Sequence, residues 1–159
     1  MEKLKAALQG RPIWMNALFV FCAYMTFIYM PFDMFIKPVA EDEEIWFGFV
    51  LHGWAAKATE PIHWAIYGAG FYGFLHMKPW MHPWAAVYVV QVAIAMAVFP
   101  WLNQGAPIYA GLIVAVPFVI LAVMLIRAKD TFDGNRAVAV TPDAQEIPEA
   151  ESDTNNQKD

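Results

Sequence analysis

Titratable side chains gather at one point of an otherwise apolar sequence. His52, Lys57, Glu60 and His63 fall within twelve residues, next to Thr59. Polar groups are expensive inside a membrane protein, so a concentration of them is the best pointer to a site.

Two spacings within this stretch suggest chemistry. Glu60 and His63 have the Glu-x-x-His spacing that bundle helices use in di-iron carboxylate proteins. If one helix runs through the whole segment, the directions of His52 and His63 around its axis differ by only about 20°, so both side chains lie on the same face. Glu60 and Tyr67 join that face. The spacing therefore predicts a common site if the helix is continuous.

Three hypotheses account for the cluster. In the first, the residues are structural: Glu60 caps a helix, Lys57 extends toward the headgroups, and the histidines bond to neighbouring helices. In the second, they form a polar pocket for a headgroup, a quinone or a lipid-like molecule, covered by Trp46, Trp54 and Trp64. The candidate ligand-binding residues are then His52, Trp54, Lys57, Glu60, His63, Trp64 and Tyr67.

In the third hypothesis, His52, Glu60 and His63 hold iron or haem. The sequence gives this hypothesis little support, because it has no second Glu-x-x-His and only four histidines, too few for a desaturase-type iron site. A bis-histidine haem would require the chain to fold back near Thr59. We therefore predict no metal site and no cofactor, and keep haem or iron as the alternative.

The elements that must position these residues are membrane helices. The chain of 159 residues is 59% hydrophobic, above the roughly 45–50% of soluble domains. Four apolar runs are predicted to span a bilayer of about 30 Å as helices, which makes the protein an all-α, polytopic membrane protein. They cover about residues 12–32, 60–77, 80–101 and 106–127.

The segment before the second span is predicted to be an interfacial or re-entrant helix at about residues 43–58. It is apolar but short, and it is rich in the aromatic residues that settle at headgroup depth. Thr59 is expected to cap the second span and Pro61 to lie in its first turn. The alternative is one kinked helix that joins residues 43–58 to the span.

The charges between the first span and this segment are predicted to be solvated loop charges. Asp33 and Lys37 are four residues apart and could pair, and residues 41–44 are all acidic. Gly68, Gly70 and Gly73 predict a close approach of another backbone to the second span, from the same chain or from a second copy. Gln91 is predicted to hydrogen-bond a neighbouring helix, because an amide that faced lipid would be unsatisfied.

Basic residues set the orientation. They lie mainly on one of the two alternating faces, which we expect to be cytoplasmic together with both termini, in a bacterial inner membrane or its equivalent. That face holds Lys3, Lys5, Arg11, Lys78, Arg127, Lys129 and Arg136, and the other holds Lys37 and Lys57. Residues 1–11 form a cytoplasmic segment, and residues 130–159, with a net charge of −6, are predicted to be a disordered acidic tail.

The sequence excludes several classes of function. It has no glycine-rich phosphate loop, no nucleophile beside a plausible base and no basic stripe for nucleic acid. A non-catalytic accessory subunit or a module that binds a small lipophilic ligand is the leading hypothesis. Its partners would be the lipid bilayer and another membrane protein or a second copy. A membrane redox enzyme built on the histidine and glutamate cluster is the alternative, and an oligomeric channel or carrier is a third.

Overall fold

The computed structural model describes residues 8–133 and is mostly helical. A single helix from Ile13 to Phe35 opens it and contains a π-helical segment. The elements are α2 (Ile13–Tyr24), η1 (Met25–Tyr29, π-helix), α3 (Met30–Phe35), η2 (Val39–Glu41, 3₁₀-helix), β1 (Glu43–Trp46), β2 (Phe49–His52), α4 (Trp54–His76), α5 (Met81–Gln104), α6 (Ile108–Arg127) and α7 (Lys129–Phe132).

Three helices in the described part of the chain are long and apolar enough to cross a membrane. They are Ile13–Phe35, Met81–Gln104 and Ile108–Arg127, and each overlaps a predicted span. α4 is as long as these helices but less apolar, since its first turns carry Lys57 and Glu60. The helices therefore identify a protein that is embedded in a membrane.

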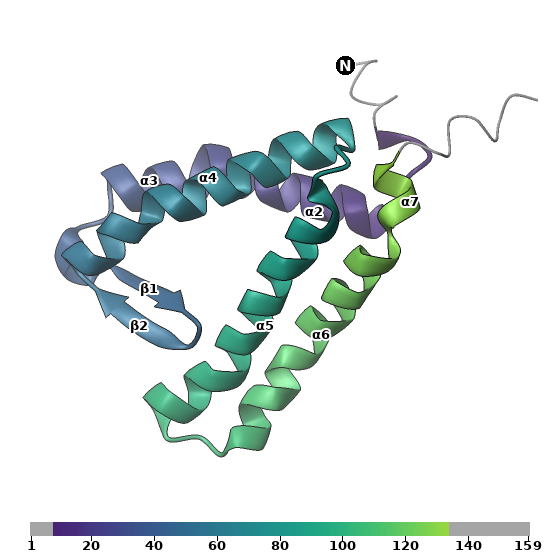
Figure 1. The fold of residues 1–159 in the computed structure, drawn as a ribbon. Helices are drawn as coiled ribbons and strands as arrows, with labels where there is room; N and C mark the ends of the chain where they lie inside the picture. The colour runs from purple at the N-terminus through teal and green to yellow at the C-terminus, as the bar shows by residue number, and fades with distance from the viewer. Residues whose placement is uncertain (1–7, 134–159) are drawn as a thin grey trace, which may run out of the picture.

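The helices form two groups that meet at one end (Figure 1). α4 packs along α2 and α3, and α5 packs against α6 as an antiparallel pair that leaves the first group at an angle. A buried cluster forms where the groups meet. It joins the start of α2 to the end of α4, the start of α5, the end of α6 and α7, through Met15, Phe74, Met81, Leu125 and Phe132.

One backbone carbonyl of the π-helical segment, that of Thr26, is available to a partner outside its own helix. A π-type bond to the carbonyl of Thr26 would come from residue 31, and Pro31 has no amide hydrogen to give. The Trp64 indole nitrogen on α4 instead donates to that carbonyl at 2.8 Å. The irregular turn thus becomes a contact between α2–α3 and α4.

Residues 43–52 form an antiparallel β-hairpin, so the prediction of an interfacial helix at 43–58 is wrong and the fold is not purely α-helical. Glu43 pairs with His52 and Trp46 with Phe49 across a two-residue turn. Both turn residues, Phe47 and Gly48, have positive φ (53° and 93°), as a type I′ turn requires. The aromatic and β-branched residues that suggested a headgroup-level helix are equally typical of strands.

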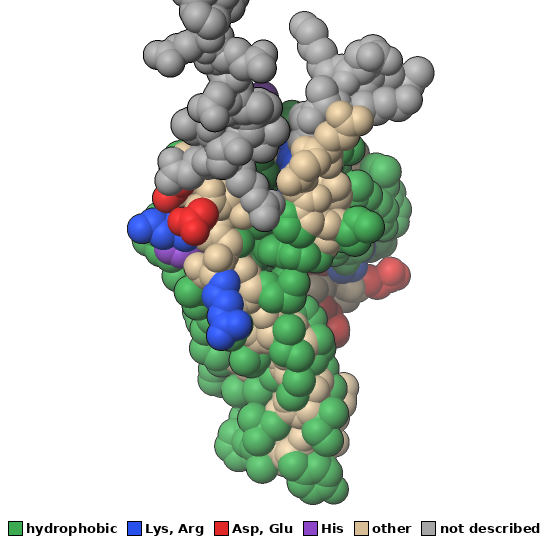
Figure 2. Space-filling model, turned by 90° about the vertical axis from the view of Figure 1, so that its right-hand side faces the viewer, with side chains coloured by type: hydrophobic (Ala, Val, Ile, Leu, Met, Phe, Trp, Pro, Cys, Tyr) green, Lys and Arg blue, Asp and Glu red, His purple; other side chains and the backbone are tan. Residues whose placement is uncertain are grey.

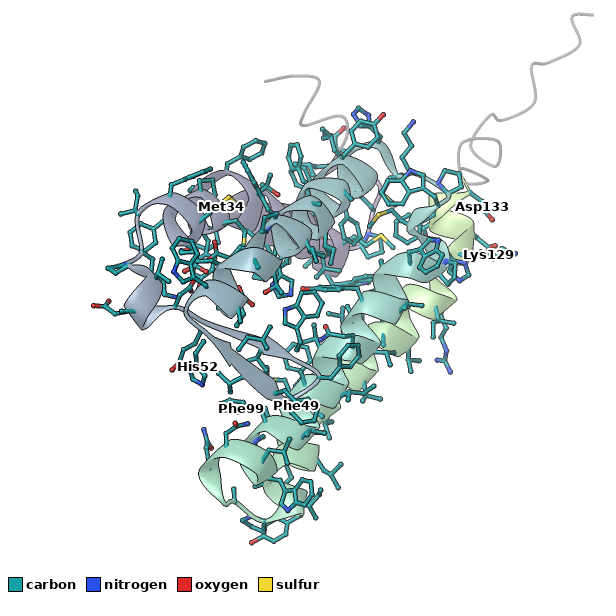
Figure 3. The ribbon with its side chains drawn as sticks, turned by 60° about the vertical axis from the view of Figure 1, so that its left-hand side comes forward. Met34, Phe49, His52, Phe99, Lys129 and Asp133 are labelled. Carbon is teal, nitrogen blue, oxygen red and sulfur yellow. The ribbon has the colours of Figure 1, made fainter. Side chains whose placement is uncertain are left out.

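The tip of the hairpin is held against the far end of α5. A Cβ added at Gly48 would lie 2.6 Å from Cβ of Val98, so only glycine fits this contact. The Asn103 amide donates to the Gly48 carbonyl oxygen at 2.9 Å. Figure 3 shows the hairpin reaching across to α5, where Phe99 lies, with His52 at its outer end.

α4 begins at Trp54, six residues before the predicted start at about residue 60. Residues 54–58 therefore join the predicted second span in one helix, whereas residues 43–53 do not. Pro61 lies inside α4 rather than in its first turn, and Thr59 donates to the Ala56 carbonyl at 2.8 Å instead of capping the helix.

The chain beyond α6 is ordered for longer than predicted. Residues 129–132 form α7, and Phe132 is buried, so the tail expected from residue 130 cannot begin there. The rest of that predicted tail, residues 134–159, lies outside the described residues, as do residues 1–7 of the predicted N-terminal segment.

Glycine lets three helix pairs approach closely. A Cβ at Gly70 would lie 2.8 Å from the Cys22 sulfur on α2, and one at Gly73 would overlap Met81. Gly68 makes only an ordinary contact with Thr26. In the α5–α6 pair, a Cβ at Gly111 would overlap the carbonyl of Ala97.

Candidate ligand-binding cavity and buried ion cluster

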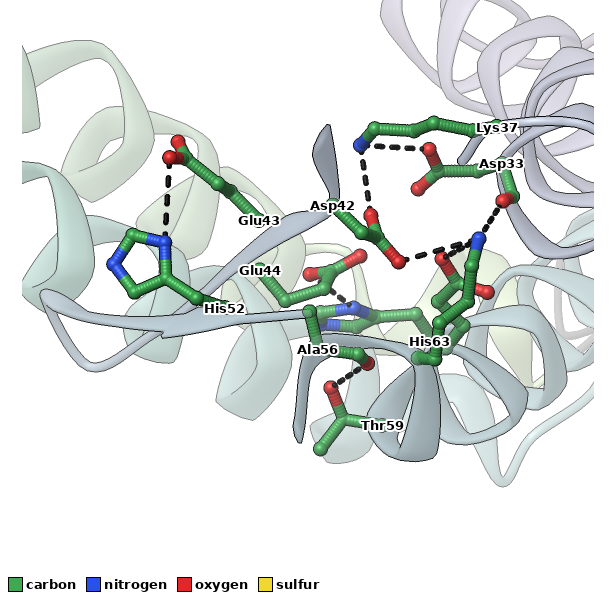
Figure 4. Close-up of polar contacts among 11 residues, drawn as sticks. Asp33, Lys37, Asp42, Glu43, Glu44, His52, Ala56, Thr59 and His63 are labelled. Atoms are coloured by element: carbon green, nitrogen blue, oxygen red, sulfur yellow. Dashed lines mark hydrogen bonds and ion pairs between the residues drawn. The ribbon is translucent and has the colours of Figure 1, made fainter. Parts of the chain in front are cut away.

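Five charged side chains meet between the end of α3 and the start of α4, and we call them the ion cluster: Asp33, Lys37, Asp42, Lys57 and Glu60 (Figure 4). The 3₁₀ turn before β1 brings the Asp42 carboxylate between the two lysine ammonium groups. The carboxylates of Asp33, Asp42 and Glu60 are almost fully buried. Asp33, Lys37 and Asp42 are therefore not the solvated loop charges that the sequence predicted, and Asp33 and Lys37 form the pair that their spacing allowed.

The two lysines bridge the three acids. Lys37 Nζ lies 3.0 Å from Asp33 and 2.8 Å from Asp42. Lys57 Nζ lies 3.2 Å from Asp42 and 3.1 Å from Glu60, and it also donates to the backbone carbonyl of Asp33. Asp42 in turn accepts the amide of Gly53 at its own carbonyl, at 2.9 Å. The ion cluster thus ties the base of the hairpin to α3 and α4.

Contacts within the ion cluster stabilise the charged forms of Asp42 and Lys37. Burial by itself raises the pKa of Asp42, but hydrogen bonds from Lys37, Glu60 and Lys57 outweigh it and leave that pKa below its usual value. Burial likewise acts to lower the pKa of Lys37, yet its bonds to Asp42 and Asp33 raise it overall. Three acids face two lysines, so one negative charge is in surplus within the ion cluster.

The acids of the ion cluster also have metal-ligand spacing. One oxygen each from Asp33, Asp42 and Glu60 lie within 4.8 Å of one another, and no other such group of histidine, cysteine or acidic ligands occurs within residues 8–133. However, each of these carboxylates already pairs with a lysine ammonium group. A metal ion would have to displace a paired ammonium, so the arrangement is suited to tie segments together rather than to bind a cation.

The two histidines of the predicted cluster lie in different surroundings. His63 is buried on α4, stacks on Trp46 with ring centroids 4.2 Å apart, and places Nδ1 2.9 Å from Glu44. His52 ends β2 and is exposed, with Nδ1 3.3 Å from Glu43. The structure therefore does not bring His52, Glu60 and His63 together as the iron or haem hypothesis would require.

The predicted tryptophan cover is dispersed as well. Trp46 stacks on His63, Trp64 bonds to the carbonyl of Thr26, and Trp54 is 78% exposed. Lys57 and Glu60 belong to the ion cluster. Among the residues predicted to bind a ligand, Tyr67 is the one that lines the cavity described next.

That cavity lies between α2, α4, α5 and α6 and has a volume of about 540 Å³. Phe47, at the tip of the hairpin, forms part of its wall. Apolar and aromatic side chains line nearly all of it, and its lining residues are Leu18, Phe21, Cys22, Phe47, Ile66, Tyr67, Ala69, Gly70, Phe74, Trp80, Met81, Trp84, Ala85, Val87, Tyr88, Val89, Gln91, Val92, Phe118, Leu121 and Leu125.

A small polar group interrupts this apolar wall. The Tyr88 hydroxyl donates to the Tyr67 hydroxyl at 3.2 Å, and Gln91 lies one helical turn beyond Tyr88 on α5. Tyr67 also lies beside His63, with ring centroids 6.3 Å apart. The sequence indicated Tyr67 and Gln91 separately, but Tyr88 was missed. The sequence did carry a signal for Tyr88, because it lies three positions before Gln91 and therefore on the same face of the helix.

Comparison with known proteins adds no further constraint. No protein-family model, no curated protein sequence and no solved structure matches this chain. The cavity and the ion cluster are therefore the features on which a function can be argued.

Proposed function

We propose that this chain is a four-span membrane protein with both ends on the cytoplasmic side, and that it binds a small lipophilic ligand without catalysing a reaction on it. The cavity between α2, α4, α5 and α6 is the observation that carries the proposal. Its volume falls within the range of about 300–1,000 Å³ typical of ligand sites, and its wall is apolar with a few convergent polar groups.

The packing of the helix ends supports an even number of spans. The start of α2 and the end of α6 share one buried cluster, so the chain returns to the side from which it entered. Three crossings would leave those ends on opposite sides, and α4 supplies the fourth. Its 23 residues extend about 35 Å, enough for the hydrocarbon core.

The charges of α4 are compatible with this role. Lys57 and Glu60 lie at its first turns and pair within the ion cluster, so neither charge faces lipid alone. At its other end, Arg11 donates to the carbonyls of Phe74 and Leu75, where a cation also complements the helix dipole. Arg11, with Lys78 and the basic residues that end α6, marks the cytoplasmic side.

The outer surface supports a lipid environment for α5 and α6. Hydrophobic side chains cover most of the lower part of the face drawn in Figure 2. On α6, Ile113 is 67% exposed and Leu112 is 55% exposed. Water would oppose so continuous an apolar surface, whereas lipid tails match it.

Topology is tested with reporter fusions. Alkaline phosphatase, active only outside the cytoplasm, is fused after residue 133 or within the hairpin turn at 47–48, and a cytoplasm-active fluorescent protein is fused at the same positions. Phosphatase activity at the hairpin and fluorescence at the C-terminal fusion support four spans. Phosphatase activity at both positions would show three.

Ligand binding is tested by filling the cavity. Ala69 lines it and is exposed, so Ala69→Phe should occupy cavity volume without disturbing buried packing. Ala65→Phe is the matched control, because Ala65 is also exposed on α4 and does not line the cavity. The three proteins are purified in mild detergent, and their bound lipids are extracted and quantified by mass spectrometry.

The expected result is a neutral lipid present at near one per chain in the unmodified protein and in Ala65→Phe, and several-fold depleted in Ala69→Phe. Equal lipid content in all three proteins would overturn the proposal. Thermal unfolding of each variant shows whether depletion reflects a lost fold rather than a filled cavity.

A further inference from the structure

The cavity wall restricts the charge of what it can hold. None of its lining residues is acidic or basic. A fatty acid carboxylate or a lipid phosphate placed there would be a buried charge without a counterion, which is among the most unfavourable arrangements in a protein. The enclosed part of the ligand must therefore be uncharged.

The aromatic content of the wall favours a flat ring over a saturated chain. Phe21, Phe74, Trp80, Trp84 and Phe118 all line the cavity, together with Phe47 from the hairpin. Aromatic faces and edges pair with a planar ring in stacked or edge-on arrangements, which contribute beyond the area they bury.

The polar group in the wall calls for a hydrogen-bond acceptor. Tyr88 donates to Tyr67, so the hydroxyl hydrogen of Tyr67 is left for another acceptor. Gln91 adds an amide from the next turn of α5. A buried donor that finds no acceptor is destabilising, so a ligand with a carbonyl oxygen at this point would be preferred to a plain hydrocarbon.

We infer that the ligand is a quinone with an alkyl or prenyl tail, bound with one ring carbonyl at the hydroxyl pair of Tyr67 and Tyr88 and its ring among the aromatic side chains. This inference rests on the proposed function, because it names the ligand class of the same cavity. It assigns binding alone and no electron transfer.

The probes are decylubiquinone and decylbenzene. Both carry a six-membered ring and a ten-carbon tail, and only the first has ring carbonyls. Quinones quench tryptophan fluorescence, and Trp80 and Trp84 line the cavity, so titration of the purified protein with decylubiquinone gives an apparent Kd. Decylbenzene is measured by its competition with the quinone. The same titration of Ala69→Phe, whose cavity is filled, measures the quenching that comes from quinone dissolved in the detergent.

The variants remove hydroxyl groups and leave the rings. Tyr67→Phe and Tyr88→Phe are made singly and together, and Tyr109→Phe is the control, because Tyr109 is 64% exposed on α6 and does not line the cavity. We expect the double variant to weaken decylubiquinone binding roughly tenfold and to leave decylbenzene unchanged, as the loss of one or two hydrogen bonds predicts. Gln91→Leu should weaken the quinone alone by a smaller factor.

Two results separate the inference from the proposed function. If both probes bind, Ala69→Phe blocks both, and the hydroxyl variants change neither affinity, the cavity binds lipophilic molecules but the quinone inference is wrong. If neither probe shows binding that Ala69→Phe removes, the proposed function fails with it. Thermal unfolding shows whether the double variant is folded. If it is not, the decylubiquinone affinities of the two single variants test the inference instead.

Discussion

Replacement of Lys57 by methionine tests whether the ion cluster holds the fold together. The Lys57 ammonium contacts the carboxylates of Asp42 and Glu60 and the backbone carbonyl of Asp33, and its side chain is only 10% exposed. Methionine keeps most of the apolar stem and removes the charge. The acids then face a single lysine, Lys37, and a second negative charge is in surplus.

The free energy lost has an upper bound set by proton uptake. Instead of holding the extra charge, one carboxylate of the cluster can take a proton. At pH 7 this costs an ordinary aspartate about 4 kcal/mol, since it lies roughly three units above its usual pKa at 1.36 kcal/mol each. Measured losses on breaking a buried ion pair are about 3–5 kcal/mol. We therefore expect Lys57→Met to reduce the free energy of unfolding by about 3–4 kcal/mol at pH 7, and by only about 1.5 kcal/mol at pH 5, where protonation is easier.

The assay is reversible unfolding of the detergent-solubilised protein at both pH values, followed by tryptophan fluorescence. Lys129→Met is the control, because Lys129 is exposed on α7 and a surface substitution changes stability by less than about 0.5 kcal/mol. Adding Asp42→Asn to Lys57→Met removes one acid with the lysine and should recover part of the loss. A loss below 1 kcal/mol at pH 7, or one that grows as the pH falls, would refute the reasoning.

Three further predictions follow from single contacts. Gly48→Ala should lower the melting temperature and destabilise the protein by about 2 kcal/mol or more, because its new methyl group meets Val98 and its φ is positive; an unchanged melting temperature would contradict the docked hairpin. Gly111→Val should disrupt the α5–α6 pair at Ala97, with a loss of several kcal/mol or of folded protein altogether, measured by yield in size-exclusion chromatography; a monodisperse, equally stable variant would argue against this packing. Because the pKa of Asp42 is lowered in the folded protein, the stability it contributes is present above about pH 4 and lost as the pH falls further, so Asp42→Asn should flatten the acid limb of the melting-temperature curve, and parallel curves would contradict this.

The ion cluster shows why the candidate site was predicted only in part. Lys57 and Glu60 stand out because a lysine and a glutamate begin a long apolar run, and Asp33 and Lys37 have the spacing of a helical pair. Asp42 lies in a run of four acids, and its neighbours Glu41 and Glu43 are exposed. The sequence does not distinguish the buried acid from the exposed ones, because burial depends on where the 3₁₀ turn and the hairpin direct each side chain.

The hairpin shows the same limit for secondary structure. Phe47 with positive φ is uncommon, and it persists because Gly48 fits against Val98 and Asn103 binds the turn. Residues from the far end of α5 thus stabilise a turn whose local sequence does not require it. A pattern of aromatic and apolar residues was compatible with a helix and with a hairpin, and a contact about fifty residues away along the chain decided between them.

The membrane helices, by contrast, depend on the sequence alone. An uncharged apolar run of about twenty residues must satisfy its own backbone hydrogen bonds wherever lipid surrounds it, so length and composition locate the helices at 13–35, 81–104 and 108–127 to within a few residues. The cavity, its tyrosine pair and the paired charges are decided by the tertiary structure. Each arises where side chains from separate helices converge, and convergence depends on packing angles and loop paths that no local pattern encodes.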